Sequence, residues 1–423
     1  MIDIKKLRED PTPYRENAKK KFQDPEVIDK VLSLDESWRQ VKNDIDQKRA
    51  ERNKVSQEIN TLKKEGKNAD AQLSRAKEIP QELKELEEKE QSVKEERDRL
   101  LKDIPNIMHP DVPLGKDDSQ NVEQERFGPE AVSKEVKAHQ IAAEDLGVAD
   151  FESSATTSGT GFYYIEGDLA LLNQALIRYG VDTMYKKGFR YVETPLMLRG
   201  HVVQNVVDLG DQENQIYKIE GEDLYLIGTS EHSLIGRFVG RTVKENQLPI
   251  KQTSYSMCFR REKGSHGLDE RGLFRTHQFN KVEMVVICKP EDSMKHFKEL
   301  QDITVEIFTG LGLPTRVLKI CSGDLGNLKH IQVDVEVWSP RRNEFIEVGS
   351  CSNLTDAQAR GLGIKADNGK DRYTPHTLNN TAIATSRALV AILENYQNED
   401  GSITVPEVLR PYMHGIEKIE SQK

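Results

Sequence analysis

The residues best suited to chemistry lie in one short stretch of the 423-residue chain, from Phe259 to Phe279. Arginines at 260, 261, 271 and 275 and histidines at 266 and 277 surround a polar loop with three glycines, between two strand-like ends. A guanidinium fork matches phosphate oxygens and keeps its charge, so the stretch predicts a hairpin that clamps a polyphosphate. A hairpin with an exposed charged turn explains the same residues equally well. The sequence contains no GxxxxGK[ST] segment, which excludes a P-loop as the phosphate site.

Cysteine spacing and net charge exclude two further kinds of site. The cysteines at 258, 288, 321 and 351 are 30 or more residues apart, so no thiolate zinc site or dense disulfide framework can be drawn. Histidines 139, 201 and 330 lack metal-like spacing and are expected to be packed or exposed. With 61 Lys and Arg against 71 Asp and Glu, the net charge of -10 argues against non-specific coating of nucleic acid. Any nucleic-acid contact must use a local basic patch.

No stretch approaches the roughly 18 apolar residues that a membrane span needs. The opening residues MIDIKKLRED carry no apolar run of signal-peptide length. We therefore expect a cytoplasmic protein with no membrane segment.

A long helical hairpin is predicted between residues 26 and 103, where charged residues dominate and glycine occurs only at Gly66. Apolar residues four and three apart form one seam over 27–62 and a second over 73–104, as in a coiled coil. A short turn between the seams favours an antiparallel hairpin within one chain. Pro80 is expected to kink the second helix.

Charge is uneven along this predicted arm. Residues 48–77 hold nine Lys and Arg against four Asp and Glu, whereas residues 26–47 and 78–103 are net acidic. The basic tip suits phosphates. An ordinary solvated coiled-coil face or a dimerisation rod remains an alternative.

Globular sequence follows a Pro, Gly and Asp-rich linker at about 104–128. Helical patterns cover 166–187, 293–311 and 383–397, and strand patterns cover 217–219, 224–227, 282–287, 333–338 and 344–348. Several strands follow one another without helices between them, so we expect an α+β domain with a mainly antiparallel sheet flanked by helices.

The order of the motifs resembles the seryl-tRNA synthetase family of class II aminoacyl-tRNA synthetases over nearly the whole chain. MIDIKKLREDP resembles the family's N-terminus, the hairpin its tRNA-binding arm and HPDVPLGKDD its interdomain linker. YKKGFRYVETPLML resembles motif 1, FRREKG through RTHQFNKVE motif 2, and ATSRALVAILENYQ motif 3. The resemblance implies an N-terminal tRNA-binding domain (1–105) with its arm at 26–103, a linker (106–130) and an aminoacylation domain (131–423).

The resemblance also implies an AMP-forming serine–tRNA ligase. It would use ATP and Mg²⁺ to activate L-serine as seryl-adenylate and transfer serine to the 3′ end of tRNA(Ser), with tRNA(Sec) as a further candidate. Motif 1 would lie at a homodimer interface. The alternatives are a synthetase-like paralogue that loads a small amino acid onto a carrier protein, and a non-catalytic coiled-coil RNA-binding protein.

Site residues carried over from the resemblance fall into four sets. The catalytic residues are Arg260, Glu283 and Arg387, with Arg260 at the α-phosphate and Arg387 at the γ-phosphate of ATP. The ATP-binding set is Arg260, Arg261, Glu262, Arg275, Thr276, His277, Phe279 stacked on adenine, Glu347, Val348, Gly349, Ser350 and Arg387, of which Glu347 and Ser350 are the expected Mg²⁺ ligands. The serine-binding set is Thr229, Ser230, Glu231, Glu283, Asn379 and Thr381, with Glu283 and Thr381 reading the hydroxyl. The tRNA-binding set is Lys48, Arg49, Arg52, Lys54, Lys63 and Lys64.

Four positions depart from the common family pattern and concern backbone shape more than charge: Gly228, Glu270, Gly349 and residues 384–386.

Overall fold

The computed structural model describes residues 1–207, 214–262 and 271–421. The chain divides into two compact units. One comprises residues 2–19 and 23–105, and the other comprises residues 106–423 together with residue 1 and residues 20–22. Each unit is described separately below.

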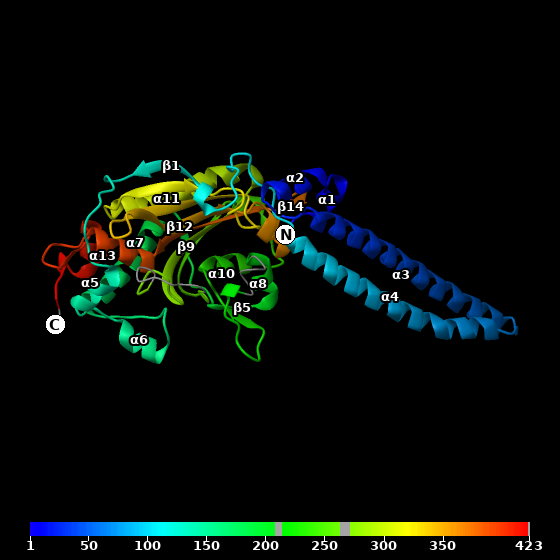
Figure 1. Cartoon of the computed structure of the whole chain (residues 1–423). Coiled ribbons are helices and arrows are strands. Elements are labelled where there is room, and N and C mark those ends of the chain that lie inside the picture. Colours follow the sequence, from blue (N-terminus) through cyan, green and yellow to red (C-terminus); the bar gives the residue numbers. More distant parts are fainter. Residues whose placement is uncertain (208–213, 263–270, 422–423) are drawn as a thin grey trace. The chain divides into compact units, whose positions relative to one another are not determined.

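Two long helices dominate the N-terminal unit (Figure 1). Short helices α1 (Ile4–Glu9) and α2 (Thr12–Lys20) precede α3 (Glu26–Lys64) and α4 (Asp70–Asp103). The predicted hairpin is confirmed, and α4 continues through Pro80. Acidic residues in the first turn of α3 and lysines in its last turn match the helix dipole. At about 1.5 Å per residue, the 39 residues of α3 span about 58 Å.

The hairpin is held by an apolar seam and by ion pairs between its helices. Buried Val41, Ile45 and Val55 of α3 pack against Ile79 and Leu83 of α4. Ion pairs link the same two helices: Arg75 with Glu51, Lys48 with Glu82, and Arg49 with Glu87. The two helices therefore stabilise each other without a partner chain, as the antiparallel seams predict.

A buried carboxylate fixes the base of the arm. Asp35 of α3 is 1% exposed and pairs with Arg97 of α4, Arg8 of α1 and Arg39 of its own helix. A buried charge is stable only when it is paired and hydrogen-bonded, and here three guanidinium groups meet that need. Asp35 thus joins three of this unit's helices, α1, α3 and α4.

The second unit is built on an eight-stranded sheet in the described part of the chain, with the order β1-β10-β11-β12-β15-β9-β8-β4. Its strands are β1 (Val122–Phe127), β4 (Arg190–Tyr191), β8 (Ile250–Phe259), β9 (Gln278–Cys288), β10 (Thr315–Lys319), β11 (Ile331–Ser339), β12 (Glu344–Asn353) and β15 (His376–Ala384). All neighbours are antiparallel except β4 and β8, which are parallel. The predicted α+β class with a mainly antiparallel sheet is confirmed.

Helices α7 (Gly167–Lys186), α11 (Ser293–Gly310) and α13 (Thr385–Asn395) pack on this sheet (Figure 1). Shorter helices are α5 (His139–Asp145), α6 (Phe151–Thr157), α8 (Gly200–Val206), α10 (Ser230–Gly236) and α12 (Ala357–Gly361), with 3₁₀ turns at 118–120, 245–247, 290–292 and 407–413. Small sheets are formed by β2 (Ala149–Asp150) with β3 (Tyr164–Ile165), by β5 (Met197–Arg199) with β6 (Leu224–Leu226), by β7 (Thr242–Lys244) with β13 (Lys365–Asp367) and β14 (Arg372–Tyr373), and by β16 (Ile403–Thr404) with β17 (Lys418–Ile419). Within the described ranges, no helix is both long and apolar enough to span a membrane.

Side-chain alternation gives the sheet two different faces. On β9, Val282 and Met284 belong to the apolar core, whereas Lys281 and Glu283, which alternate with them along the strand, line a cavity. The strand β11 repeats the pattern, with valines in the core and Gln332, Asp334 and Glu336 in the cavity. Successive strand residues point to opposite faces, so one face builds the core and the other is free for polar chemistry.

Three segments differ from their sequence predictions. The predicted linker 106–130 includes β1, which pairs with β10 at the edge of the main sheet. The helix predicted from residue 383 begins at Thr385, because Ile383 and Ala384 still belong to β15. The predicted strand 217–219 contributes only an isolated bridge, between Lys218 and Tyr225.

Candidate functional site

A cavity of about 1100 Å³ brings most of the predicted site residues together. The predicted residues that line it are Thr229, Glu231, Arg260, Glu262, Arg275, Thr276, Phe279, Glu283, Glu347, Val348, Gly349, Ser350, Asn379, Thr381 and Arg387. They come from β9, β12 and β15, from the segments that follow β8 and precede β9, and from α10 with its N-cap and α13. The cavity therefore collects predicted residues that lie up to 158 positions apart in the sequence, from Thr229 to Arg387.

The hairpin of β8 and β9 positions the arginines of the motif 2 segment. Arg260 directly follows β8, and its guanidinium carbon lies 5.3 Å from the ring centre of Phe279 on β9. Its Nε donates to the carbonyl of Gly228 at 3.3 Å. Arg275 pairs with Glu262 at 3.2 Å. The hairpin thus presents two guanidinium groups and an aromatic ring to one cavity, which suits a nucleotide.

Three predicted residues do not line the cavity. Ser230 is fully buried and donates to the carbonyl of Ser254, and Arg261 is exposed. His277 packs behind the hairpin, where its Nδ1 lies 2.9 Å from the Arg260 carbonyl and its ring stacks on Phe162. His277 therefore supports the wall of the site. The polar loop 263–270, including Glu270, lies outside the described residues.

Arg387 and Glu347 meet at another part of the cavity. Arg387, near the start of α13, donates to the Glu347 backbone carbonyl at 2.8 Å and to its Oε2 at 3.0 Å. Burial alone would raise the pKa of the Glu347 carboxyl, but the charge and hydrogen bond of Arg387 hold it below its usual value. Glu347 is consequently an anion, and its two hydrogen bonds hold the guanidinium of Arg387 in the cavity.

Polar side chains of β11 extend this region, and the sequence prediction missed them. Gln332 donates to Asp334 at 2.7 Å and to the Ser350 hydroxyl at 2.9 Å. Burial and the neighbouring charge of Glu347 raise the pKa of Asp334 to about 8. Gln332, Asp334 and Glu336 alternate with valines in the sequence, and this period of two was the signal that could have identified a polar face.

Another region of the cavity is acidic, because the carboxyl groups of Glu231 and Glu283 line it. Thr229 caps α10, and its hydroxyl accepts from the Glu231 backbone N–H. Glu231 accepts from Gln358 Nε2 at 2.7 Å. Burial, with the charge of Glu283, raises the pKa of the Glu231 carboxyl to about 7. Such a group is easily ionised when a cation binds beside it.

Glu283 is held by two neighbours. Lys281 Nζ lies 2.5 Å from Glu283 Oε2, and the hydroxyl of Thr381 donates to the same oxygen at 3.3 Å. Lys281 was not among the predicted site residues, although it stands two residues before Glu283 on the same face of β9. The pair lies in the cavity with Asn379, which is 7% exposed.

The structure shows how much space surrounds two of the positions that depart from the family pattern, Gly349 and Gly228. A Cβ at Gly349 would come within 2.9 Å of the Thr304 side chain and 3.2 Å of the Thr381 carbonyl, so a side chain there would require both to shift. A Cβ at Gly228 would meet only ordinary contacts, the nearest 3.4 Å from Ile216. Packing therefore favours glycine at position 349 but not at position 228.

Comparison with known proteins gives one consistent family. The model of the seryl-tRNA synthetase N-terminal domain matches residues 1–108, and the model of the tRNA synthetase class II core domain (G, H, P, S and T) matches residues 216–396. The chain is 45% identical to the serine–tRNA ligase of Methanocella arvoryzae, over 99% of this chain and 100% of that protein.

Solved structures agree with these matches. The crystal structure of seryl-tRNA synthetase from Pyrococcus horikoshii complexed with ATP is 39% identical, with a TM-score of 0.91 and full coverage of both chains. The cytoplasmic serine–tRNA ligase from Naegleria fowleri in complex with AMP is 31% identical, with a TM-score of 0.84, over 98% of this chain and 97% of that one.

Proposed function

Because the chain belongs to the seryl-tRNA synthetase family, we propose that it activates L-serine with ATP and transfers the seryl group to the 3′ end of tRNA(Ser). The observation that carries the proposal is the single cavity lined both by Arg260 and Arg387 and by Glu231 and Glu283. The complexes of the two similar structures with ATP and AMP support a nucleotide in this cavity. Neither alternative function is favoured, since both family models match and the charged site residues are present.

Activation forms a bond between a serine carboxylate oxygen and the α-phosphorus, and breaks the bond from that phosphorus to the bridging oxygen of pyrophosphate. Both reactants are anions at pH 7, so the site must position them and offset their charge. We assign Arg260 to the α-phosphate, Phe279 to the adenine ring and Arg387 to the γ-phosphate. The 3′-terminal ribose hydroxyl then attacks the carbonyl carbon of seryl-adenylate, and AMP leaves.

Serine recognition is assigned to the carboxylate region. Glu231 and Glu283 offer negative charge to the serine ammonium, and Thr381 with Glu283 offers partners to its hydroxyl. Alanine would leave those buried polar groups unsatisfied, which is costly. Lys281 offsets part of the buried charge of Glu283, whose carboxylate oxygens can accept a hydrogen bond from the serine hydroxyl.

The donor set also fits Mg²⁺. Glu347 and Ser350 offer only oxygen atoms, and no group of three or more His, Cys, Asp and Glu in the described ranges is arranged to hold a metal by itself. Mg²⁺ commonly uses one or two protein ligands and completes its shell with waters and substrate phosphates. When bound there, it would offset charge on the ATP phosphates.

The basic residues of the arm fall into two groups. Lys48 and Arg49 pair with glutamates of the arm itself. Arg52, Lys54, Lys63 and Lys64 are exposed, and none of them forms an ion pair within the part of the chain that the structure describes. We therefore assign tRNA phosphate binding to these four residues, and stabilisation of the hairpin to Lys48 and Arg49.

A homodimer through motif 1 is part of the proposal. The segment exposes Tyr185, Tyr191, Leu196 and Met197, and β4 within it ends the main sheet. Exposed apolar side chains beside an open sheet edge are typical of an interface. We also propose residues 1–105 as the tRNA-binding domain and residues 131–423 as the aminoacylation domain of a cytoplasmic enzyme, joined by residues 106–130, of which β1 is part of the main sheet.

Aminoacylation of tRNA(Ser) with labelled serine tests whether the arm is needed to charge tRNA while the cavity alone activates serine. Deletion of residues 40–90, replaced by a short linker, should abolish tRNA charging while serine-dependent ATP–pyrophosphate exchange continues. Charging at the normal rate by the deleted chain would show that the arm serves another purpose.

A further inference from the structure

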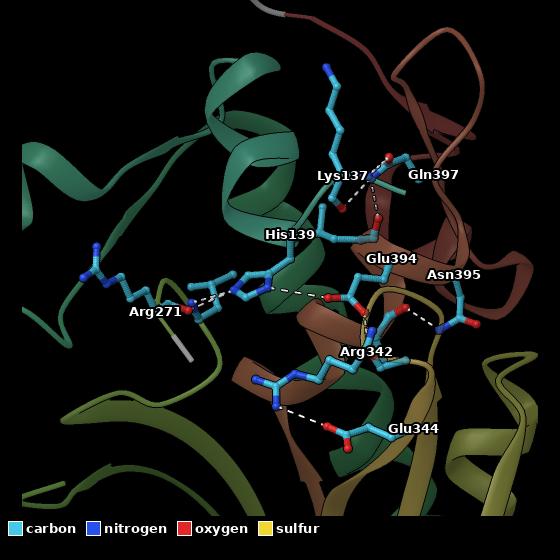
Figure 2. A network of polar contacts seen from close by, with 12 residues as sticks. Lys137, His139, Arg271, Arg342, Glu344, Glu394, Asn395 and Gln397 are labelled. Atoms are coloured by element: carbon cyan, nitrogen blue, oxygen red, sulfur yellow. Dashed lines mark hydrogen bonds and ion pairs between the residues drawn. The ribbon is translucent and has the colours of Figure 1, made fainter. Parts of the chain in front are cut away.

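His139, which lies outside the cavity, connects the motif 2 and motif 3 segments. It is the first residue of α5 and is only 1% exposed. Its Nε2 accepts the backbone N–H of Leu273 at 3.2 Å and lies 3.1 Å from the Arg271 carbonyl. Its Nδ1 lies 3.7 Å from Oε1 of Glu394 on α13. Figure 2 shows His139 between Arg271 on one side and Glu394 on the other.

Both ring nitrogens of His139 have polar neighbours. Nε2 lies between the backbone N–H of Leu273, which donates, and the carbonyl of Arg271, which can only accept, whereas Nδ1 faces Glu394. Glu394 is 2% exposed, and its other oxygen accepts from the Ser339 hydroxyl. The buried carboxylate thus has one partner from β11 and one from α5.

The backbone of the motif 2 segment fits closely around this ring. Gly272 has a positive φ of 69°, and a Cβ there would lie 2.8 Å from His139 Nε2 and 2.9 Å from the Gln140 Cβ. Only glycine permits both the left-handed conformation and the close approach. Residues 271–273 are therefore anchored on His139, directly before Phe274.

The anchored segment leads directly to a cavity residue. Phe274 follows Leu273 and lines the cavity, and the guanidinium carbons of Arg342 and Arg387 lie 3.8 Å and 5.1 Å from its ring centre. Arg387 and Glu394 are seven residues apart on α13, which places them on the same side of the helix. One helix thus carries both an arginine of the site and the carboxylate that faces His139.

We propose that His139 is a positioning residue of the ATP site. Through Nε2 it holds residues 271–273, and through Glu394 it ties them to α13, so that Phe274 fixes the guanidinium of Arg387. The proposal rests on the proposed function for one point, that Arg387 meets the γ-phosphate. It follows that loss of the Nε2 contact weakens binding of ATP but not of AMP, which lacks that phosphate.

Two substitutions distinguish the contributions of the two ring nitrogens of His139 to ATP binding. An asparagine amide reaches the position of Nδ1, and a glutamine amide reaches that of Nε2. His139→Asn should weaken ATP binding about 5- to 10-fold, the cost of one unmet hydrogen bond, while AMP binding stays within about twofold. His139→Gln should keep ATP binding within about twofold of the wild type. His296→Asn is the matched control, because His296 is a buried histidine that pairs with Glu299 away from the cavity.

Calorimetric titration of the full chain with ATP and with AMP measures these affinities without serine. Unchanged ATP affinity in His139→Asn, or an equal loss for ATP and AMP, would overturn the proposal, as would equal losses in His139→Asn and His139→Gln. If His139→Asn does not fold, Phe274→Leu decides: it removes the ring that lies beside the Arg387 guanidinium, so it should show the same selective loss of ATP affinity, and wild-type affinity for ATP would refute the role. A wild-type chain that binds ATP but shows no serine-dependent exchange would contradict the proposed function alone.

Discussion

The carboxyl group of Glu231 should make serine affinity depend on pH near neutrality. Its pKa of about 7 comes first from burial and then from the charge of Glu283. The serine ammonium is bound well only by the ionised form, which is about nine-tenths of the empty protein at pH 8 and about one-tenth at pH 6. The KM for serine should therefore rise about tenfold between pH 8 and pH 6, with little change in kcat.

The assay is serine-dependent ATP–pyrophosphate exchange at half-unit steps of pH. His232 does not interfere, since burial and the charges of Lys281 and Arg260 lower its pKa to about 3. Glu231→Gln should raise the KM for serine and remove its pH dependence. A wild-type KM for serine that is flat from pH 6 to pH 8 would refute the reasoning.

The ionisation of Glu231 should also make the free energy of unfolding of the substrate-free protein depend on pH. The folded pKa is raised from 4.5 to about 7, so the stability due to neutral Glu231 is complete below about pH 4.5 and is lost as the pH rises through 7. The shift corresponds to about 3 kcal/mol at pH 8. Glu231→Gln should therefore raise the free energy of unfolding at pH 8 by up to about 3 kcal/mol, measured by denaturant titration, and by much less at pH 5.

Three further predictions concern other parts of the molecule. Thr381→Val removes the hydroxyl that contacts Glu283, so the serine/alanine ratio of kcat/KM in exchange should drop roughly 5- to 150-fold, as expected for about 1–3 kcal/mol; an unchanged ratio would mean that the hydroxyl is read elsewhere. Replacing Lys63 and Lys64 with alanine should reduce the salt dependence of tRNA binding by about one unit of slope per lost phosphate contact, whereas Lys89→Ala on the acidic shaft should leave it unchanged. Asp35→Ala leaves three arginines without their buried partner and should lower the stability of the N-terminal unit by about 3–5 kcal/mol while ATP–pyrophosphate exchange is retained; an unchanged unfolding transition of that unit would contradict this role.

The helical hairpin could be predicted because the pattern that specifies it lies within one continuous segment of the sequence. The apolar seams repeat every three and four residues, and the turn after Lys64 lies where the seams stop. The strand β1 could not be predicted in the same way. Its sequence VEQERF has no apolar alternation and its side chains are mostly exposed, because an edge strand can be held by backbone hydrogen bonds alone.

The site was predicted in part, and His139 is a missed residue that no local pattern could have revealed. Arg260, Glu283 and Arg387 stand in recognisable motifs, and they do line one cavity. His139 stands alone in the sequence, and its partners Leu273 and Glu394 lie more than 100 residues away. A single histidine carries no periodic or motif signal, so only the fold reveals what it contacts.

Pyrophosphate exchange measured separately with each of the common amino acids tests the central claim most directly. We expect rapid, ATP-dependent exchange with L-serine, much slower exchange with alanine and threonine, and almost none with serine when Arg260 is replaced by alanine. Exchange driven best by another amino acid, or undiminished exchange in Arg260→Ala, would contradict the assignment of this cavity to serine activation.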